Sequence, residues 1–227
     1  MNKKKVLSLA LVVIMIAILS FSTLAWFTDN ESVKNDFQIA GSDDDTADEI
    51  FSVDVWEDRN GDGVADNELT GEEEGLNYKD ILPGDVLDKV VYVKNTGYYD
   101  QYIRVTVKID QAAIWAAALG SDFNDATLQA MFGGFDITAW GEISTKVENN
   151  QIVVTMYYND ILAVGGDIVV FDTVNIPNQL TREQAAYMGA NGFSITVTAD
   201  AVQTENLGID LTDGICDAYQ AFAVVEA

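Results

Sequence analysis

The sequence predicts an all-β fold, an antiparallel β-sandwich with short helical insertions. Apolar and polar residues alternate in several segments, as they do in strands that bury one face. The alternation is clearest in 102–109 and is repeated in 193–202. Further strands are expected at 50–56, 86–94, 135–147, 152–158 and 168–176. A core built from many short strands is typical of a sandwich.

Turn-forming residues separate some of these strands. The stretch Asn95-Thr96-Gly97 supplies turn chemistry between 86–94 and 102–109, which predicts an antiparallel hairpin with a short loop. The pair Asn149-Asn150 is expected to turn the next hairpin.

Two stretches break the β pattern. From Asp110 to Gly120, an aspartate N-cap opens an alanine-rich run that a glycine ends, and a second short helix is expected up to Gly133. Thr181 and Gln184 form a capping-box signature that opens a third helix. We expect these helices to cover the ends of the sheets.

The N-terminus has the pattern of a secretory signal. Lysines occupy positions 3–5, and no charged residue follows in 6–27. Ala25 offers the small residue that a signal peptidase needs, so cleavage is expected before Trp26, with 1–25 as the signal peptide. The alternative is a retained membrane anchor. The sequence therefore predicts a secreted protein, with membrane contact only through an uncleaved signal peptide.

The mature chain is strongly acidic. Removing the signal peptide leaves 202 residues with nine basic and 37 acidic side chains, a net charge of −28. Such a surface repels nucleic acid and anionic lipid, so neither is an expected partner, and it attracts cations. We expect 26–49 to form a strand and an acidic leash, and 50–227 to form the sandwich domain.

The chain contains no histidine and one cysteine, Cys216. Ser-His-Asp catalysis, Cys-His catalysis and histidine-ligated zinc are therefore excluded, and we expect no enzyme activity. A single thiol allows no internal disulfide, and Cys216 is expected to be a buried apolar residue.

An acidic segment contains a pattern that resembles a calcium loop. Residues 41–75 hold 14 acidic side chains and one basic side chain. Within it, 58–66 matches the first nine positions of an EF-hand loop, with Gly63 at the sharp turn. The predicted ligands are Asp58, Asn60, Asp62, the backbone carbonyl of Val64, and Asp66. Position 12 is Leu69 instead of glutamate, so the alternative is a solvated acidic turn.

Several short motifs point to one family. The junction Ala25-Trp26-Phe27-Thr28-Asp29-Asn30-Glu31 resembles those of proteins that the dedicated signal peptidase SipW processes. The ordered motifs Leu82-Pro83-Gly84-Asp85, Asn95-Thr96-Gly97, Tyr102-Ile103-Arg104-Val105 and Ala201-Val202-Gln203 resemble the core of the TasA and camelysin family.

This resemblance implies a jelly-roll-like sandwich that is secreted and assembles into fibres of the biofilm matrix. The segment after the signal peptide would then serve as a donor strand for the next subunit of a head-to-tail homopolymer. Camelysin is described as a metalloprotease, but the absence of histidine and of an HExxH site gives that activity no support here.

Residues 32–40 fit the donor-strand expectation. Val33, Phe37 and Ile39 share one face, and small or acidic residues follow in 41–49. Burying three such side chains contributes roughly 5 to 9 kcal/mol. Association costs about 4 to 15 kcal/mol, so the backbone ladder of the added strand must supply the rest.

Two alternatives stay open from sequence alone. The segment 32–40 could be the first strand of its own sheet instead of a donated strand. The corresponding alternative function is a monomeric, calcium-stabilised cell-surface module that binds a partner.

Overall fold

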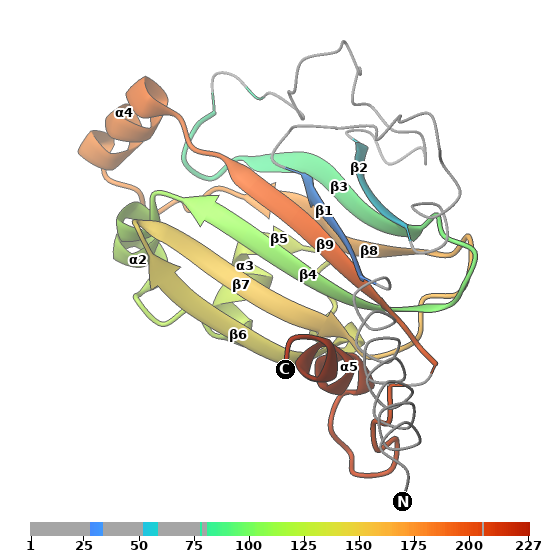
Figure 1. Cartoon of the computed structure of the whole chain (residues 1–227). Coiled ribbons are helices and arrows are strands. Elements are labelled where there is room, and N and C mark those ends of the chain that lie inside the picture. The colour runs from blue at the N-terminus through green and yellow to red at the C-terminus, as the bar shows by residue number, and fades with distance from the viewer. Residues whose placement is uncertain (1–27, 34–51, 59–77, 79–80, 206) are drawn as a thin grey trace, which may run out of the picture.

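The computed structural model describes residues 28–33, 52–58, 78, 81–205 and 207–227. These residues form two antiparallel sheets (Figure 1). Sheet A has the order β1-β9-β4-β7-β6, and sheet B has the order β2-β3-β8-β5. The strands are β1 (Thr28–Val33), β2 (Val53–Asp58), β3 (Val86–Asn95), β4 (Gln101–Asp110), β5 (Phe132–Gly133), β6 (Trp140–Glu148), β7 (Gln151–Tyr158), β8 (Asp167–Asn175) and β9 (Ile195–Gln203).

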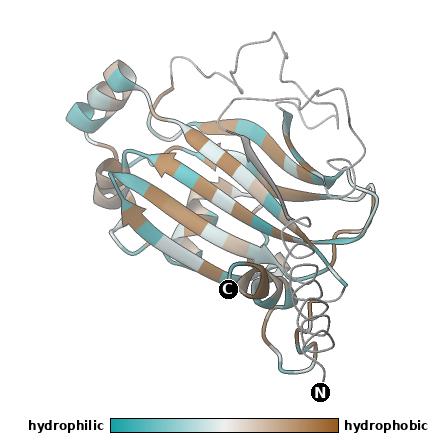
Figure 2. Ribbon diagram, in the orientation of Figure 1, coloured by the Kyte–Doolittle hydropathy of each residue, from teal (hydrophilic) through white to brown (hydrophobic). Residues whose placement is uncertain are grey.

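The two sheets face each other across one apolar core, which confirms the predicted β-sandwich. Val91 and Val93 of β3, and Ile103 and Val105 of β4, have no exposed surface. Their polar neighbours point outward, so the hydropathy alternates along the strands (Figure 2). Each buried aliphatic side chain stabilises the sandwich by about 1.5 to 3 kcal/mol.

The connection between β3 and β4 differs from the predicted hairpin, which is wrong. β3 pairs with β2 and β8 in sheet B, whereas β4 pairs with β7 and β9 in sheet A. The two strands therefore lie in opposite sheets. Each presents an apolar face to the core between the sheets. The buried Asn95 holds this crossover: its Nδ2 donates to the carbonyls of Tyr99 (2.8 Å) and Leu162 (2.9 Å).

The hairpin predicted at Asn149-Asn150 is confirmed. These residues join β6 to β7 with φ angles of 51° and 63°, the left-handed conformation that a tight hairpin turn requires. The carbonyl of Asn150 also accepts a hydrogen bond from the amide of Ala112 (2.9 Å), which fixes the start of the earlier helix 112–119 against the turn.

The helical insertions are α2 (Ala112–Leu119), α3 (Asp125–Met131), the 3-10 helix η2 (Ile137–Ala139), α4 (Arg182–Asn191) and α5 (Asp217–Val225). Three helices lie where the sequence predicts them, α2, α3 and α4, whereas η2 and α5 were not predicted. The strand predicted at 135–147 is wrong in its first five residues, because η2 precedes β6, which begins at Trp140. The capping box of Thr181 and Gln184 at the start of α4 is confirmed. None of the described helices combines the length and the hydropathy of a membrane span.

The cap of α2 differs from the predicted one. Gln111, with φ 65°, occupies the N-cap position, and its side chain makes no capping hydrogen bond. The amide of Ala113 in the first turn donates to Asn150 Oδ1 of the β6–β7 turn (3.1 Å). Asp110 is instead the last residue of β4, where its carboxylate accepts hydrogen bonds from Gln151 Nε2 (2.7 Å) and Ser194 Oγ (2.5 Å). Strand pairing therefore extends one residue further than the sequence pattern suggests.

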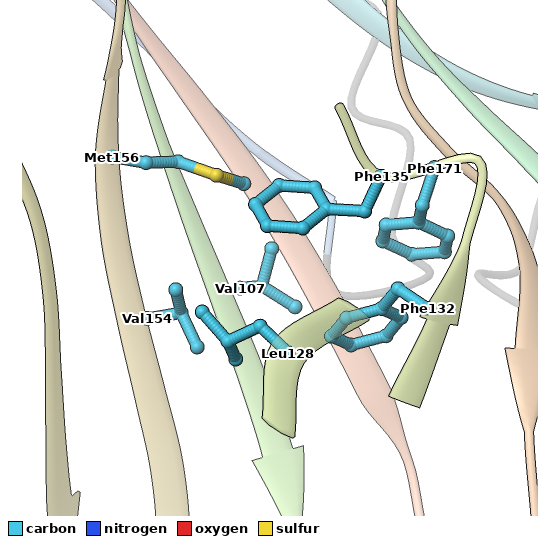
Figure 3. A pocket seen from close by; sticks show the side chains of 7 residues that line it. All are labelled: Val107, Leu128, Phe132, Phe135, Val154, Met156 and Phe171. Carbon is cyan, nitrogen blue, oxygen red and sulfur yellow. The ribbon is translucent and has the colours of Figure 1, made fainter. Parts of the chain in front are cut away.

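The helix α3 closes the side of the sandwich on which sheet B is shortest. Leu128 and Met131 are buried, and α3 leads directly into the two-residue strand β5. A small apolar cavity remains between α3 and both sheets (Figure 3). Its lining residues are Val107, Leu128, Phe132, Phe135, Val154, Met156 and Phe171. A cavity without polar lining offers no chemistry, so we interpret it as imperfect core packing.

Candidate functional site

The N-terminal strand β1 forms one edge of sheet A, beside β9 (Figure 1). The pairing is antiparallel and runs from Thr28 opposite Val202 to Val33 opposite Val197. β2, at the edge of sheet B, lies next to both β1 and β9. Without β1, the backbone of β9 would present unpaired N–H and C=O groups along this edge.

The inner face of β9 is narrow and tightly packed. Val197, Ala199 and Ala201 alternate along the strand and are at most 1% exposed. The small alanines let the opposite sheet approach closely, so an unpaired β9 would expose both backbone and core at this edge. The edge of β9 that β1 covers is therefore the candidate site for pairing with a strand of another copy.

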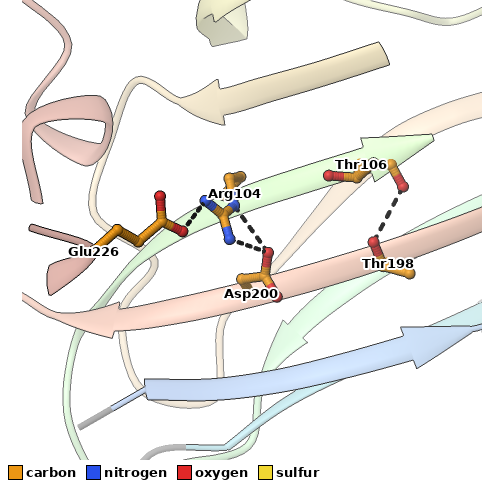
Figure 4. A network of polar contacts seen from close by, with 5 residues as sticks. All are labelled: Arg104, Thr106, Thr198, Asp200 and Glu226. Carbon is orange, nitrogen blue, oxygen red and sulfur yellow. Dashed lines mark hydrogen bonds and ion pairs between the residues drawn. The ribbon is translucent and has the colours of Figure 1, made fainter. Parts of the chain in front are cut away.

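A charged network lies on the outer face of β4 and β9 (Figure 4). Arg104 donates to Asp200 Oδ2 from Nε (2.8 Å) and forms an ion pair with it through Nη2 (2.7 Å). Its Nη1 pairs with Glu226 Oε1 (2.5 Å), just beyond α5. In the strand register, Asp200 lies opposite Arg104 on one side and opposite Asn30 of β1 on the other. The network thus adjoins the candidate edge.

Burial and ion pairing act in opposite directions on Arg104. Burial disfavours its charge, but the hydrogen bonds with Glu226 and Asp200 outweigh this effect and raise the pKa of Arg104 above its ordinary value. The guanidinium also lies over the ring of Phe222, 4.4 Å from the ring centroid. Arg104 therefore binds both β9 and the C-terminal helix.

The helix α5 covers one end of the outer face of sheet A. A second apolar cluster joins it to the sheet: Tyr102, Val202, Leu207, Ala218, Ala221 and Phe222. Cys216, the N-cap residue of α5, is partly buried at the edge of this cluster. Burial raises the pKa of its thiol, which makes Cys216 a weak nucleophile, as expected for an apolar packing residue.

The structure places some of the predicted site residues. Val33 is the last residue of β1, whereas Phe37 and Ile39 lie outside the described residues. β1 also begins four residues before the predicted strand 32–40. Asp58 ends β2 and is fully buried, and the other predicted calcium ligands, Asn60, Asp62, Val64 and Asp66, lie outside the described residues.

Buried charges gather where β2 ends. Glu57, next to Asp58, forms an ion pair with Lys89 of β3, and neither residue exposes more than 6% of its surface. Burial is the main influence on Lys89 and lowers its pKa, while Glu57 acts in the opposite direction. Among the described residues, no group of three His, Cys, Asp or Glu side chains could hold a metal ion.

Sequence reasoning missed the helix α5 and the role of Arg104. Ala218, Ala221, Phe222 and Val225 recur at the spacing of one helical face, which would have predicted α5. Arg104 and Asp200 are opposite charges on the polar faces of two predicted strands. Such a pattern is a signal for a cross-strand pair.

Comparisons of this chain with protein-family models, with curated proteins and with solved structures find no match.

Replacing Asp200 with alanine should destabilise the protein by about 2 to 3 kcal/mol, because a largely buried guanidinium loses the buried carboxylate that it binds through two nitrogens. Glu226→Gln is the matched control, since the Glu226 side chain is 57% exposed and its ion pair should contribute less than about 1 kcal/mol. Urea denaturation measures both changes. Equal losses in the two variants would contradict a dominant role for Asp200.

Proposed function

We propose that this chain is a secreted structural subunit of extracellular fibres of the biofilm matrix. Copies would polymerise head to tail, each donating its N-terminal strand to the β9 edge of the next copy. The observation that carries this proposal is the position of β1, which is the first described strand of the chain and an edge strand of sheet A. An edge position lets the same strand come from its own chain or from a neighbour.

The composition of β1 favours exchange. Its sequence, TDNESV, has one apolar residue in six, so the backbone ladder contributes most of its pairing free energy. The β9 edge of another copy offers the same ladder, which makes the two pairings nearly equal in free energy. Whether β9 pairs with its own β1 or with that of another copy then depends on two concentrations. These are the concentration of subunits and the effective concentration of the chain's own strand. Phe37 and Ile39, further along, would add apolar contacts.

The strand order supports the jelly-roll part of the proposal. β1, β4, β7 and β9 lie in sheet A, whereas β3, β5 and β8 lie in sheet B. The chain therefore crosses repeatedly between the sheets as it does in jelly rolls. The proposed route is export, cleavage after Ala25 by a dedicated signal peptidase, and assembly outside the cell, with no catalytic role.

The second candidate function is a monomeric, calcium-stabilised cell-surface module that binds a partner. One observation favours it: β1 pairs with β9 of the same chain. In this case the N-terminal strand completes its own sheet and leaves no open edge at β9.

Cysteine cross-linking distinguishes the two functions, because Ser32 lies opposite Thr198 in the β1–β9 register. In a Cys216→Ser background, one tagged variant carries Ser32→Cys and another carries Thr198→Cys. If strands are exchanged, oxidising the mixture should yield a disulfide-linked heterodimer.

The control mixes Ser32→Cys with Thr145→Cys, on the opposite edge of sheet A, and should yield much less heterodimer. The double variant Ser32→Cys/Thr198→Cys reports pairing within one chain. An intrachain disulfide in the double variant, without heterodimers in the mixture across calcium concentrations and pH, would contradict the fibre proposal and favour the monomer.

We also propose that calcium binds the loop 58–66 and steadies the sandwich, since this loop leaves β2 at the buried Asp58. At calcium concentrations about tenfold above Kd, binding should stabilise the fold by about 1.4 kcal/mol and raise Tm by roughly 3 to 6 °C. Scanning calorimetry measures the shift. Asp62→Asn/Asp66→Asn should abolish it, and Asp43→Asn/Asp44→Asn should keep it. An unchanged Tm in millimolar calcium would count against the site.

A further inference from the structure

The strand β6 forms the edge of sheet A opposite β1. It pairs with β7 on one side, and within the described part of the chain no strand lies on its other side (Figure 1). An edge of this kind presents a row of backbone N–H and C=O groups that can pair with another strand. The edge is irregular between Gly141 and Ser144, but the register from Ser144 to Glu148 is regular.

This edge is nearly neutral in a very acidic chain. Between Ile137 and Asn159 the charged residues are Glu142, Lys146 and Glu148, whereas the whole chain carries a net charge of −25. Repulsion between two copies is therefore low where their β6–β7 hairpins meet. The edge also lacks proline, so its backbone can accept a new strand.

The sequence of β6 is complementary to itself when two copies pair antiparallel around Val147. A two-fold axis at Val147 places Lys146 of each copy opposite Glu148 of the other, and Val147 opposite itself. Val147 is 55% exposed, so a contact there buries apolar surface. Lys146 and Glu148 form an exposed ion pair (2.9 Å), and pairing of two copies would join both pairs into a four-charge network.

Neighbouring registers are less favourable. Shifting the axis to Lys146 places the two lysines opposite each other, and like charges directly opposite destabilise a strand pair. An axis between Thr145 and Lys146 brings no opposite charges together. An axis at Ser144 also places Glu142 opposite Lys146, but it needs the irregular stretch between Gly141 and Ser144. The charge pattern and the regular part of the edge together favour the register centred on Val147.

We propose that the β6 edge is a lateral contact between two copies of this chain, paired antiparallel around Val147. The regular part of the edge is short, so a single contact is weak and reversible. The next step rests on the proposed function. Along the proposed fibre each subunit presents the same β6 edge, so repeated weak contacts bundle neighbouring fibres by avidity.

Charge-swap variants of the mature protein test this contact. Lys146→Glu places glutamates opposite Glu148, and Glu148→Lys places lysines opposite Lys146, so each variant alone should self-associate about tenfold or more weakly than the wild type. An equimolar mixture of the two variants, and the double variant K146E/E148K, should both regain association because opposite charges meet again. Sedimentation equilibrium measures the association, and circular dichroism confirms folding.

Fibre images separate this contact from the donor-strand proposal. Electron microscopy of Lys146→Glu should show single fibres where the wild type shows bundles. Equal association of the wild type and both single variants, or failure of the mixture to recover, would overturn the β6 contact. An absence of fibres in the wild type would overturn the proposed function, while sedimentation would still report on the β6 edge.

Discussion

The rest of the structure depends on the pairing of β9 along both of its edges. β4 pairs with one edge through nine residue positions, and β1 pairs with the other through six. Ala199 and Ala201 of β9 are fully buried, although only β1 separates this strand from the edge of the sheet. A strand in this position cannot leave its second edge open without exposing backbone groups and apolar surface to water. Some N-terminal strand, from the same chain or another, must therefore complete the sheet.

The outer face of sheet A is organised around the same strand. Asp200 of β9 binds Arg104 of β4, and Arg104 in turn binds Glu226 and lies over Phe222 of α5. The C-terminal helix is thus joined to the pair of strands that receives the N-terminal strand. Because α5 contributes a separate apolar cluster, the two ends of the chain stabilise neighbouring parts of one sheet.

The sequence predicts most strands because one buried face imposes alternation, as in β4, β7, β8 and β9. The sequence does not predict which strands pair with each other. Alternation shows which face of β3 and β4 is buried but not which strand each pairs with, so a crossover between sheets is mistaken for a hairpin. β1 lies earlier than predicted because its sequence, TDNESV, has no apolar alternation. The helix α5 follows a detectable helical pattern, whereas the buried Glu57–Lys89 pair depends on tertiary contacts that no local pattern encodes.

Hydrogen exchange at the backbone amides of β9 tests the dependence on an N-terminal strand most directly. A protein of residues 26–227 is compared with a deletion variant of residues 41–227, with and without a synthetic peptide of residues 26–40. Alternate β9 amides, those that point toward β1, should exchange rapidly in the deletion variant, while those bonded to β4 stay protected, and the peptide should restore protection. Full protection of β9 in the deletion variant without peptide would contradict the account.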